Sequence, residues 1–94
     1  MSVTIEQTDD IAACLALRRA VFIEEQGVSE ADEVDMLDDA CLHLLARDGD
    51  LPVGTARVMI TGDVAKIGRV CVLPSHRGTG LGKALILAAL EAVR

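Results

Sequence analysis

The sequence predicts a small α/β domain in which a mostly antiparallel sheet is flanked by helices. Three observations predict this fold class. A strand pattern and a long helical pattern occupy residues 1–27. Three strand patterns joined by two short glycine turns follow in residues 41–73, and strands joined by tight turns pair antiparallel. A glycine-rich stretch then leads into an apolar helix, and the 94 residues suit one domain, 1–94.

The first two elements are expected to be a strand and an amphipathic helix. The strand covers residues 3–7, and Thr8 or Asp9 is expected to be the N-cap of the helix that follows. The helix then runs from about Asp10 to Glu25 and ends at Gly27. Its apolar residues fall on one arc at helical spacing: Ile11, Cys14, Leu15, Leu17, Val21 and Phe22.

One charged residue, Arg18, falls near the middle of this apolar arc. Two interpretations are open. The aliphatic stem covers apolar surface while the guanidinium stays in water. Alternatively, the guanidinium pairs with a carboxylate, for which Glu33 and Asp35 are candidates, because a lone buried charge is prohibitively unfavourable.

The segment from Glu24 to Asp39 contains eight acidic residues and no basic one, and it reads as a loop or short helix. One interpretation is a solvated acidic face. The other is an acceptor site that attracts a cationic amine, since clustered negative charge raises the local concentration of cations.

Three strands are expected at residues 41–47, 53–60 and 64–73. The tripeptides at residues 48–50 and 61–63 each contain a glycine between polar residues and form the two turns. The last helix, from about Gly80 onward, is apolar nearly all round, so it must be covered on most sides.

The glycine-rich stretch between the last strand and the last helix predicts an anion site. Gly78, Gly80 and Gly82 allow backbone N–H groups to converge, and the helix N-terminus adds unpaired donors and its dipole. Arg77 and Lys83 add full positive charges, so phosphate or pyrophosphate is the natural ligand. The alternative is a plain turn, but a turn needs one glycine and not three at alternate positions.

Two common phosphate-binding motifs do not match this stretch. A P-loop requires Gly-Lys-Ser/Thr with another glycine five positions earlier, whereas Ala84 follows Lys83 and Arg77 stands at the earlier position. A dinucleotide fingerprint requires G-x-G-x-x-G and an acidic residue about 20 positions later. Here the spacing is G-x-G-x-G, with no such acid before Arg94.

The net charge of −6 is distributed unevenly along the chain. Residues 1–63 carry four basic and fourteen acidic side chains, whereas residues 64–94 carry five basic and one acidic. A basic segment centred on the glycine-rich stretch suits capture of a small polyanion. Nucleic acid would be repelled by the rest of the chain, and Phe22 is the only aromatic residue available for base stacking.

The composition indicates a soluble, cytoplasmic protein without a metal centre. The N-terminus lacks a basic start and an apolar core typical of a secretory signal, and no apolar run reaches the roughly 18 residues of a membrane helix. Cys14, Cys41 and Cys71 form no C-x-x-C pair and are expected to be reduced. His43 and His76 are isolated, so no metal ligand set is expected.

The segment R-G-T-G-L-G at residues 77–82 resembles the Arg/Gln-x-x-Gly-x-Gly/Ala signature of the GNAT N-acetyltransferase superfamily. Residues 18–28 (R-R-A-V-F-I-E-E-Q-G-V), followed by E-V-D at residues 33–35, resemble its ElaA-like branch. The resemblance implies a GNAT fold that transfers an acetyl group from acetyl-CoA to a primary amine of a small molecule or peptide. It implies a cofactor site in which the strand end pairs with pantetheine and the loop holds the pyrophosphate: Cys71, Val72, Leu73, Arg77, Gly78, Thr79, Gly80, Leu81, Gly82 and Lys83.

The resemblance leaves the acid–base groups unassigned. Gly68 stands where some relatives carry a glutamate, and the chain has no tyrosine to protonate the leaving thiolate. Glu33 and His43 are the weak candidates for the base, although a structural role for His43 is favoured. Cys71 as an acetyl-carrying nucleophile is disfavoured, because family members transfer the group directly and apolar neighbours favour the thiol.

Family members generally continue beyond the helix that ends near Arg94. The chain is therefore expected to be the N-terminal two-thirds of the fold, with the C-terminal part absent, supplied by another chain, or compensated by a homodimer; truncation is favoured. The edge of residues 64–73 and one side of the last helix would then be uncovered. The alternative function is a non-catalytic acyl-CoA-binding or partner-binding module derived from the same fold.

Overall fold

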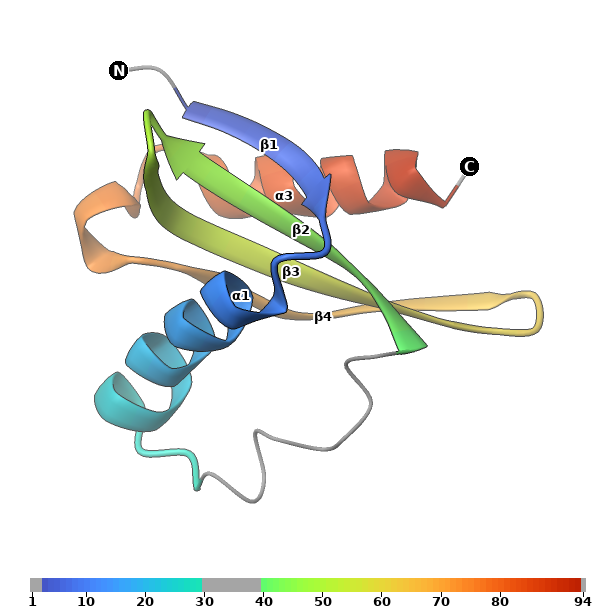
Figure 1. The fold of residues 1–94 in the computed structure, drawn as a ribbon, viewed down its shortest axis with the longest axis horizontal. Helices are drawn as coiled ribbons and strands as arrows, with labels where there is room; N and C mark the ends of the chain where they lie inside the picture. The colour runs from blue at the N-terminus through green and yellow to red at the C-terminus, as the bar shows by residue number, and fades with distance from the viewer. Residues whose placement is uncertain (1–2, 30–39, 94) are drawn as a thin grey trace.

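The computed structural model describes residues 3–29 and 40–93 and contains one four-stranded sheet (Figure 1). All neighbouring strands run antiparallel, in the order β1-β2-β3-β4. This agrees with the expected α/β class, in which the sheet is mostly antiparallel. The strands are β1 (Val3–Thr8), β2 (Cys41–Asp48), β3 (Leu51–Thr61) and β4 (Val64–Val72).

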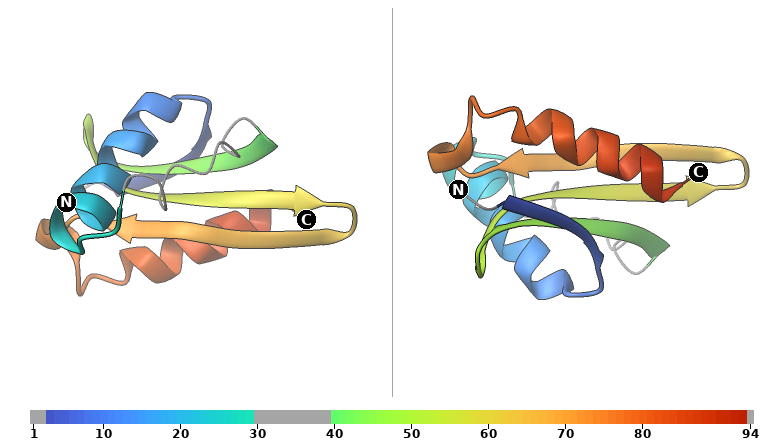
Figure 2. Two further views of the ribbon diagram at one scale, coloured as in Figure 1. Left: turned by 90° about the horizontal axis from the view of Figure 1, so that it is seen from below. Right: turned by 90° about the horizontal axis from the view of Figure 1, so that it is seen from above.

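Helices cover both faces of the sheet (Figure 2). On one face lies α1 (Ile11–Arg18), continued without a break by η1 (Arg19–Glu25). On the other face lies α3 (Leu81–Ala92), which follows a single turn of 3₁₀-helix, η3 (Pro74–His76). The centre of β3 is therefore buried on both sides, and Thr55 and Arg57 lie under α1.

The first helix differs from its expected form at two points. Its N-cap is Asp10, whose carboxylate accepts a hydrogen bond from the Ala13 N–H at 3.2 Å, so the expectation of Thr8 or Asp9 was wrong. Thr8 instead supports the cap, because its hydroxyl accepts from the Asp10 N–H. The second half is π-helical. The Gln26 N–H donates to the Val21 carbonyl five residues earlier, which is the π-helical spacing.

Two apolar clusters hold the helices against the sheet. The α1 cluster consists of Cys14, Leu17, Val21, Leu45 and Cys71. The α3 cluster joins the other sheet face to the buried side of that helix: Leu44, Ala46, Val53, Ala56, Val58, Leu81, Leu85 and Ala89. Cys14, Cys41 and Cys71 form no disulfide among the described residues.

Close packing explains the glycine in the middle of β3. A Cβ at Gly54 would lie 3.1 Å from Leu85 Cδ1 and 3.1 Å from the Cys71 carbonyl oxygen. Real Cβ contacts are rarely this short, so the missing side chain lets α3 approach the sheet.

The structure decides between the two interpretations of Arg18. Its side chain is fully buried, with 0% exposure, so the interpretation of a guanidinium in water was wrong. Arg18 is not without a partner, in keeping with the rule that a buried charge must be compensated. Its expected partners Glu33 and Asp35 lie outside the described residues, as does most of the acidic segment.

Two surfaces are left uncovered within the described part of the chain, as expected from the sequence. β4 is an edge strand that pairs only with β3 in residues 3–29 and 40–93. The outer side of α3 exposes Ile86, Leu87 and Leu90. No helix in these residues is long and apolar enough to cross a membrane.

Candidate functional site

The candidate site begins at a β-bulge in β4. Thr55 pairs with Cys71 but Arg57 pairs with Gly68, so β4 has one more residue than β3 between these pairs. The extra residue is accommodated at Arg69, which has a positive φ of 51°. A bulge increases the twist of the strand and leaves its outer groups out of regular pairing.

The strand end beyond the bulge has no further strand on its outer edge within the described residues. The Leu73 N–H donates to the Val53 carbonyl at 2.9 Å, so Leu73 still faces β3. Alternation along a strand therefore directs the N–H and C=O of Val72 to the outer edge. The side chain of Cys71 is buried against α1 and does not reach this edge.

The turn η3 carries the chain from β4 to the glycine loop, which comprises residues 77–82. Gly78 and Gly80 both have positive φ, at 79° and 82°, and Gly80 is the N-cap of α3. A Cβ at either position would meet no atom within 4 Å, so the glycines serve the backbone conformation and leave the space above the loop open.

The first turn of α3 is a suitable anion-binding end. At this end the Ala84 N–H donates a helical hydrogen bond to the Gly80 carbonyl at 3.0 Å. The turn carries no acidic residue, and no side chain among the described residues caps it. Lys83 is exposed in this turn, whereas Leu81 is buried and anchors the helix to the sheet.

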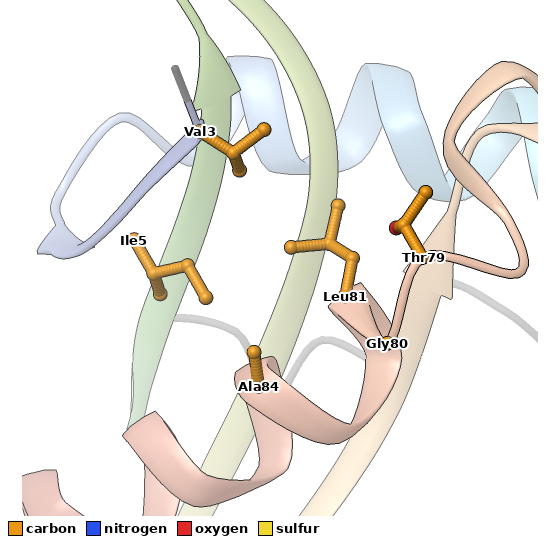
Figure 3. Close-up of a pocket in the computed structure, with 6 residues that line it drawn as sticks. All are labelled: Val3, Ile5, Thr79, Gly80, Leu81 and Ala84. Atoms are coloured by element: carbon orange, nitrogen blue, oxygen red, sulfur yellow. The ribbon is translucent and has the colours of Figure 1, made fainter. Parts of the chain in front are cut away.

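A shallow pocket of about 290 Å³ lies beside this helix end (Figure 3). Its wall is formed on one side by Thr79, Gly80, Leu81 and Ala84 of the loop and α3, and on the other by Val3 and Ile5 of β1.

The side chain of Arg77 is held away from the loop amides. Its Nε donates to the Val72 carbonyl oxygen at 3.0 Å, and its Nη2 lies 2.8 Å from Glu25 Oε1. Arg77 therefore spans the outer edge of β4 and the end of η1. The sequence placed Arg77 at the mouth of the anion site, but it gave no sign of these two contacts.

The two candidates for the base are in different situations. His43 is 3% exposed on β2, opposite Arg57, in the row of the sheet that continues to Gly68. Its alternation with Leu45 places this row on the face that α1 covers. Glu33 lies outside the described residues.

Sequence reasoning missed the burial of Arg57, because alternation alone does not reveal that a second helix layer covers that face.

The geometry combines a bulged edge strand, a glycine loop and a helix N-terminus in direct succession. Residues 5–94 match the Acetyltransferase (GNAT) family. This chain belongs to the GNAT acetyltransferase family.

Individual relatives support this assignment. YyaT of Bacillus subtilis, an uncharacterized protein, is 47% identical over 87 residues, which cover 89% of this chain and 58% of YyaT. The uncharacterized N-acetyltransferase YjcF of the same organism is 34% identical over 90 residues, covering 96% of this chain and 64% of YjcF. The crystal structure of Escherichia coli ElaA superposes with a TM-score of 0.82 at 30% identity, covering 97% of this chain and 69% of ElaA.

This GNAT chain thus spans about 60% of the length of YyaT and YjcF. The resemblance to ElaA, expected from residues 18–28 and 33–35, is confirmed at the level of the fold.

Proposed function

We propose that this GNAT chain binds acetyl-CoA at the glycine loop and the open edge of β4, and that the protein transfers the acetyl group to a primary amine. One observation carries the proposal. The bulged edge strand β4 is followed by the glycine loop and then by α3, whose N-cap is Gly80 and whose first turn contains no acidic residue. A polyanion that ends in a long amide-bearing arm fits this succession, because phosphate suits the helix end and amides suit an open strand edge.

The proposed cofactor contacts divide between two segments. Backbone groups of residues 71–73 would pair with the pantetheine arm, chiefly the Val72 N–H, because the Leu73 N–H already bonds to Val53 and the Val72 carbonyl oxygen accepts from Arg77 Nε. Backbone N–H groups of residues 77–83 would bind the pyrophosphate, with Lys83 adding a full charge. The open space above Gly78 and Gly80 permits that approach.

The transfer forms a bond between the amine nitrogen and the acetyl carbon, breaks the carbon–sulfur bond, and releases CoA as a thiolate. The amine must lose one proton, and the thiolate must gain one or be stabilised. Glu33 and His43 stay the candidates for the base. The acceptor is an unidentified small-molecule or peptide amine, and the free cysteines favour a reducing compartment such as the cytoplasm.

The test is calorimetric titration of the chain with acetyl-CoA, with Gly80→Asp as the variant. Aspartate at φ 82° is strained and would place a carboxylate at the anion site, so we expect affinity to fall by at least about 100-fold. The matched control is Gly62→Asp, which introduces the same charge at φ 58° in the turn between β3 and β4. We expect Gly62→Asp to change affinity by less than about twofold.

Arg77→Ala is expected to weaken binding by a smaller factor, because Arg77 already shares its charge with Glu25. Saturable binding by the unmodified chain that Gly80→Asp leaves unchanged would refute the placement of the pyrophosphate.

A non-catalytic acyl-CoA-binding module is the second candidate. It is favoured by the acid-free sequence of β4, residues 64–72, in which Gly68 stands opposite Arg57. Acetyl-CoA consumption with a panel of amines separates the two functions. Binding without turnover, in a protein completed to the length of its relatives, would support the module and exclude the enzyme.

A further inference from the structure

His76, the last residue of η3, lies at the centre of a hydrogen-bond cluster directly before the glycine loop. The side chain is 7% exposed. Its Nε2 lies 2.8 Å from Asp48 Oδ2, and its Nδ1 lies 2.7 Å from Ser75 Oγ. Its backbone N–H donates to the Leu73 carbonyl at 2.9 Å, and its own carbonyl accepts from the Thr79 hydroxyl at 2.7 Å.

The proton positions in this cluster follow from the chemistry of its members. An ionised carboxylate only accepts hydrogen bonds. Nε2 of His76 therefore carries a proton and donates the hydrogen bond that Asp48 accepts. The arrangement differs from a hydrolase triad, in which the aspartate binds Nδ1 and the serine binds Nε2. Here the aspartate is the partner of Nε2, and the contact ties two distant segments together.

Asp48 belongs to the rigid part of the molecule. It ends β2 and pairs with Leu51 across the tight turn into β3, where Gly49 has a φ of 62°. The chain leaves the sheet after Leu73, and η3 is only three residues long. The bond between Asp48 and His76 therefore joins the segment leading to the glycine loop to the strand framework.

We propose that Asp48 and His76 are positioning residues for the phosphate-binding loop. The bond fixes η3 against the end of β2, and the Thr79 hydroxyl passes that constraint into the loop through the His76 carbonyl. The inference rests on the proposed function for its ligand. It adds that the turn between β2 and β3, which is not expected to touch the cofactor, controls how well the loop amides converge.

Electrostatics and positioning predict opposite effects for Asp48. A carboxylate near an anion site weakens anion binding, so removing it for charge reasons alone should tighten the binding of acetyl-CoA. Removing it as the acceptor of His76 should loosen the loop and weaken binding. Asp50 is the matched control, because it is an exposed carboxylate on the same turn.

The first experiment compares acetyl-CoA affinity in Asp48→Ala and Asp50→Ala. We expect the dissociation constant to rise about tenfold in Asp48→Ala, since a hydrogen bond to a charged group is lost. In Asp50→Ala it should stay the same or fall slightly. Where turnover is measured, KM should rise and kcat should stay within about twofold, because the loop holds the non-reacting end of the cofactor.

Variants of His76 supply a rescue. His76→Gln keeps a side-chain donor near the position of Nε2 and should restore most of the affinity, whereas His76→Leu keeps the bulk without the donor and should behave as Asp48→Ala. Equal affinities in His76→Gln and His76→Leu would overturn the proposal.

Hydrogen exchange without ligand separates this inference from the proposed function. In Asp48→Ala the amides of residues 77–83 should exchange faster than in Asp50→Ala, while the amides of β2 and β3 should exchange at the same rates. An unmodified chain that binds no acetyl-CoA would refute the proposed function and leave this exchange result to decide the positioning role. Equal exchange in the two variants would overturn that role.

Discussion

The two faces of the sheet are buried to a similar extent but differ in chemistry. On the face under α3, the central residues of β2 and β3 are apolar: Leu44, Ala46, Ala56 and Val58. On the face under α1, the same strands bury His43, Thr55 and Arg57, and α1 itself buries Arg18. The difference arises from alternate residues of the same two strands.

The two faces therefore contribute differently to the stability of the fold. A buried polar group weakens a fold unless it is paired, whereas apolar groups pack without that requirement. The α3 face therefore gives the glycine loop a stable base at Leu81 and Leu85. The α1 face instead buries charged and polar groups, which must be paired, and the proposed base candidate His43 is one of them.

The largest expected effect comes from removing the buried charge of the α1 face. Arg18→Met keeps the approximate length of the side chain but removes a fully buried charge, and Arg18 is a residue that has an interaction partner. Breaking a buried charge interaction on one side costs about 3–5 kcal/mol, so we expect that loss in the free energy of unfolding. Urea denaturation measures it.

The neighbouring residue supplies the control for this variant. Arg19→Met removes the same charge from an exposed position and should change stability by less than about 0.5 kcal/mol. A loss below about 1 kcal/mol in Arg18→Met would contradict the view that the α1 face depends on paired charge.

The apolar face should respond through cavity formation. Leu85 is 0% exposed and packs where a side chain at Gly54 would lie. Leu85→Ala should therefore lower the free energy of unfolding by about 3 kcal/mol. Leu87 lies on the outer side of the same helix and is 56% exposed, so Leu87→Ala should lower the free energy of unfolding by less than about 1 kcal/mol. Equal losses in both variants would mean that the outer side of α3 is covered in solution.

The sequence predicted the elements of the fold well, because each produces a local pattern. Period-two alternation and glycine turns located the hairpins of β2, β3 and β4, and the glycine stretch located the start of α3 at Gly80. Local patterns also located the end of the first helix, since Gly27, two residues after Glu25, has a φ of 75°.

Features that depend on distant contacts were not predictable in this way. The bulge at Arg69 appears only when β4 is set in register against β3, because it is defined by the pairing of Thr55 with Cys71 and of Arg57 with Gly68. The contact between Asp48 and His76 joins residues 28 positions apart, and nothing local to either residue indicates the other. The glycine loop was proposed as a phosphate site from its glycines, whereas the hydrogen bonds of His76 directly before it were missed.

The smallest expected effect tests a contact between the end of η1 and the first residue of the glycine loop. Glu25 at the end of η1 holds Arg77 by an ion pair in which both side chains are partly exposed, so Glu25→Gln should lower stability by less than about 0.5 kcal/mol. Acetyl-CoA affinity should rise about twofold, because the Arg77 charge is no longer shared with a carboxylate.

Glu24→Gln removes the same charge from the adjacent exposed position and serves as the control, for which we expect no measurable change in affinity. The gain in Glu25→Gln should shrink at high salt, because screening weakens an exposed charge. Weaker binding in Glu25→Gln would have the opposite meaning. It would show that Glu25, at the end of η1, holds Arg77 in the orientation that the cofactor needs, so that the α1 layer contributes to cofactor binding.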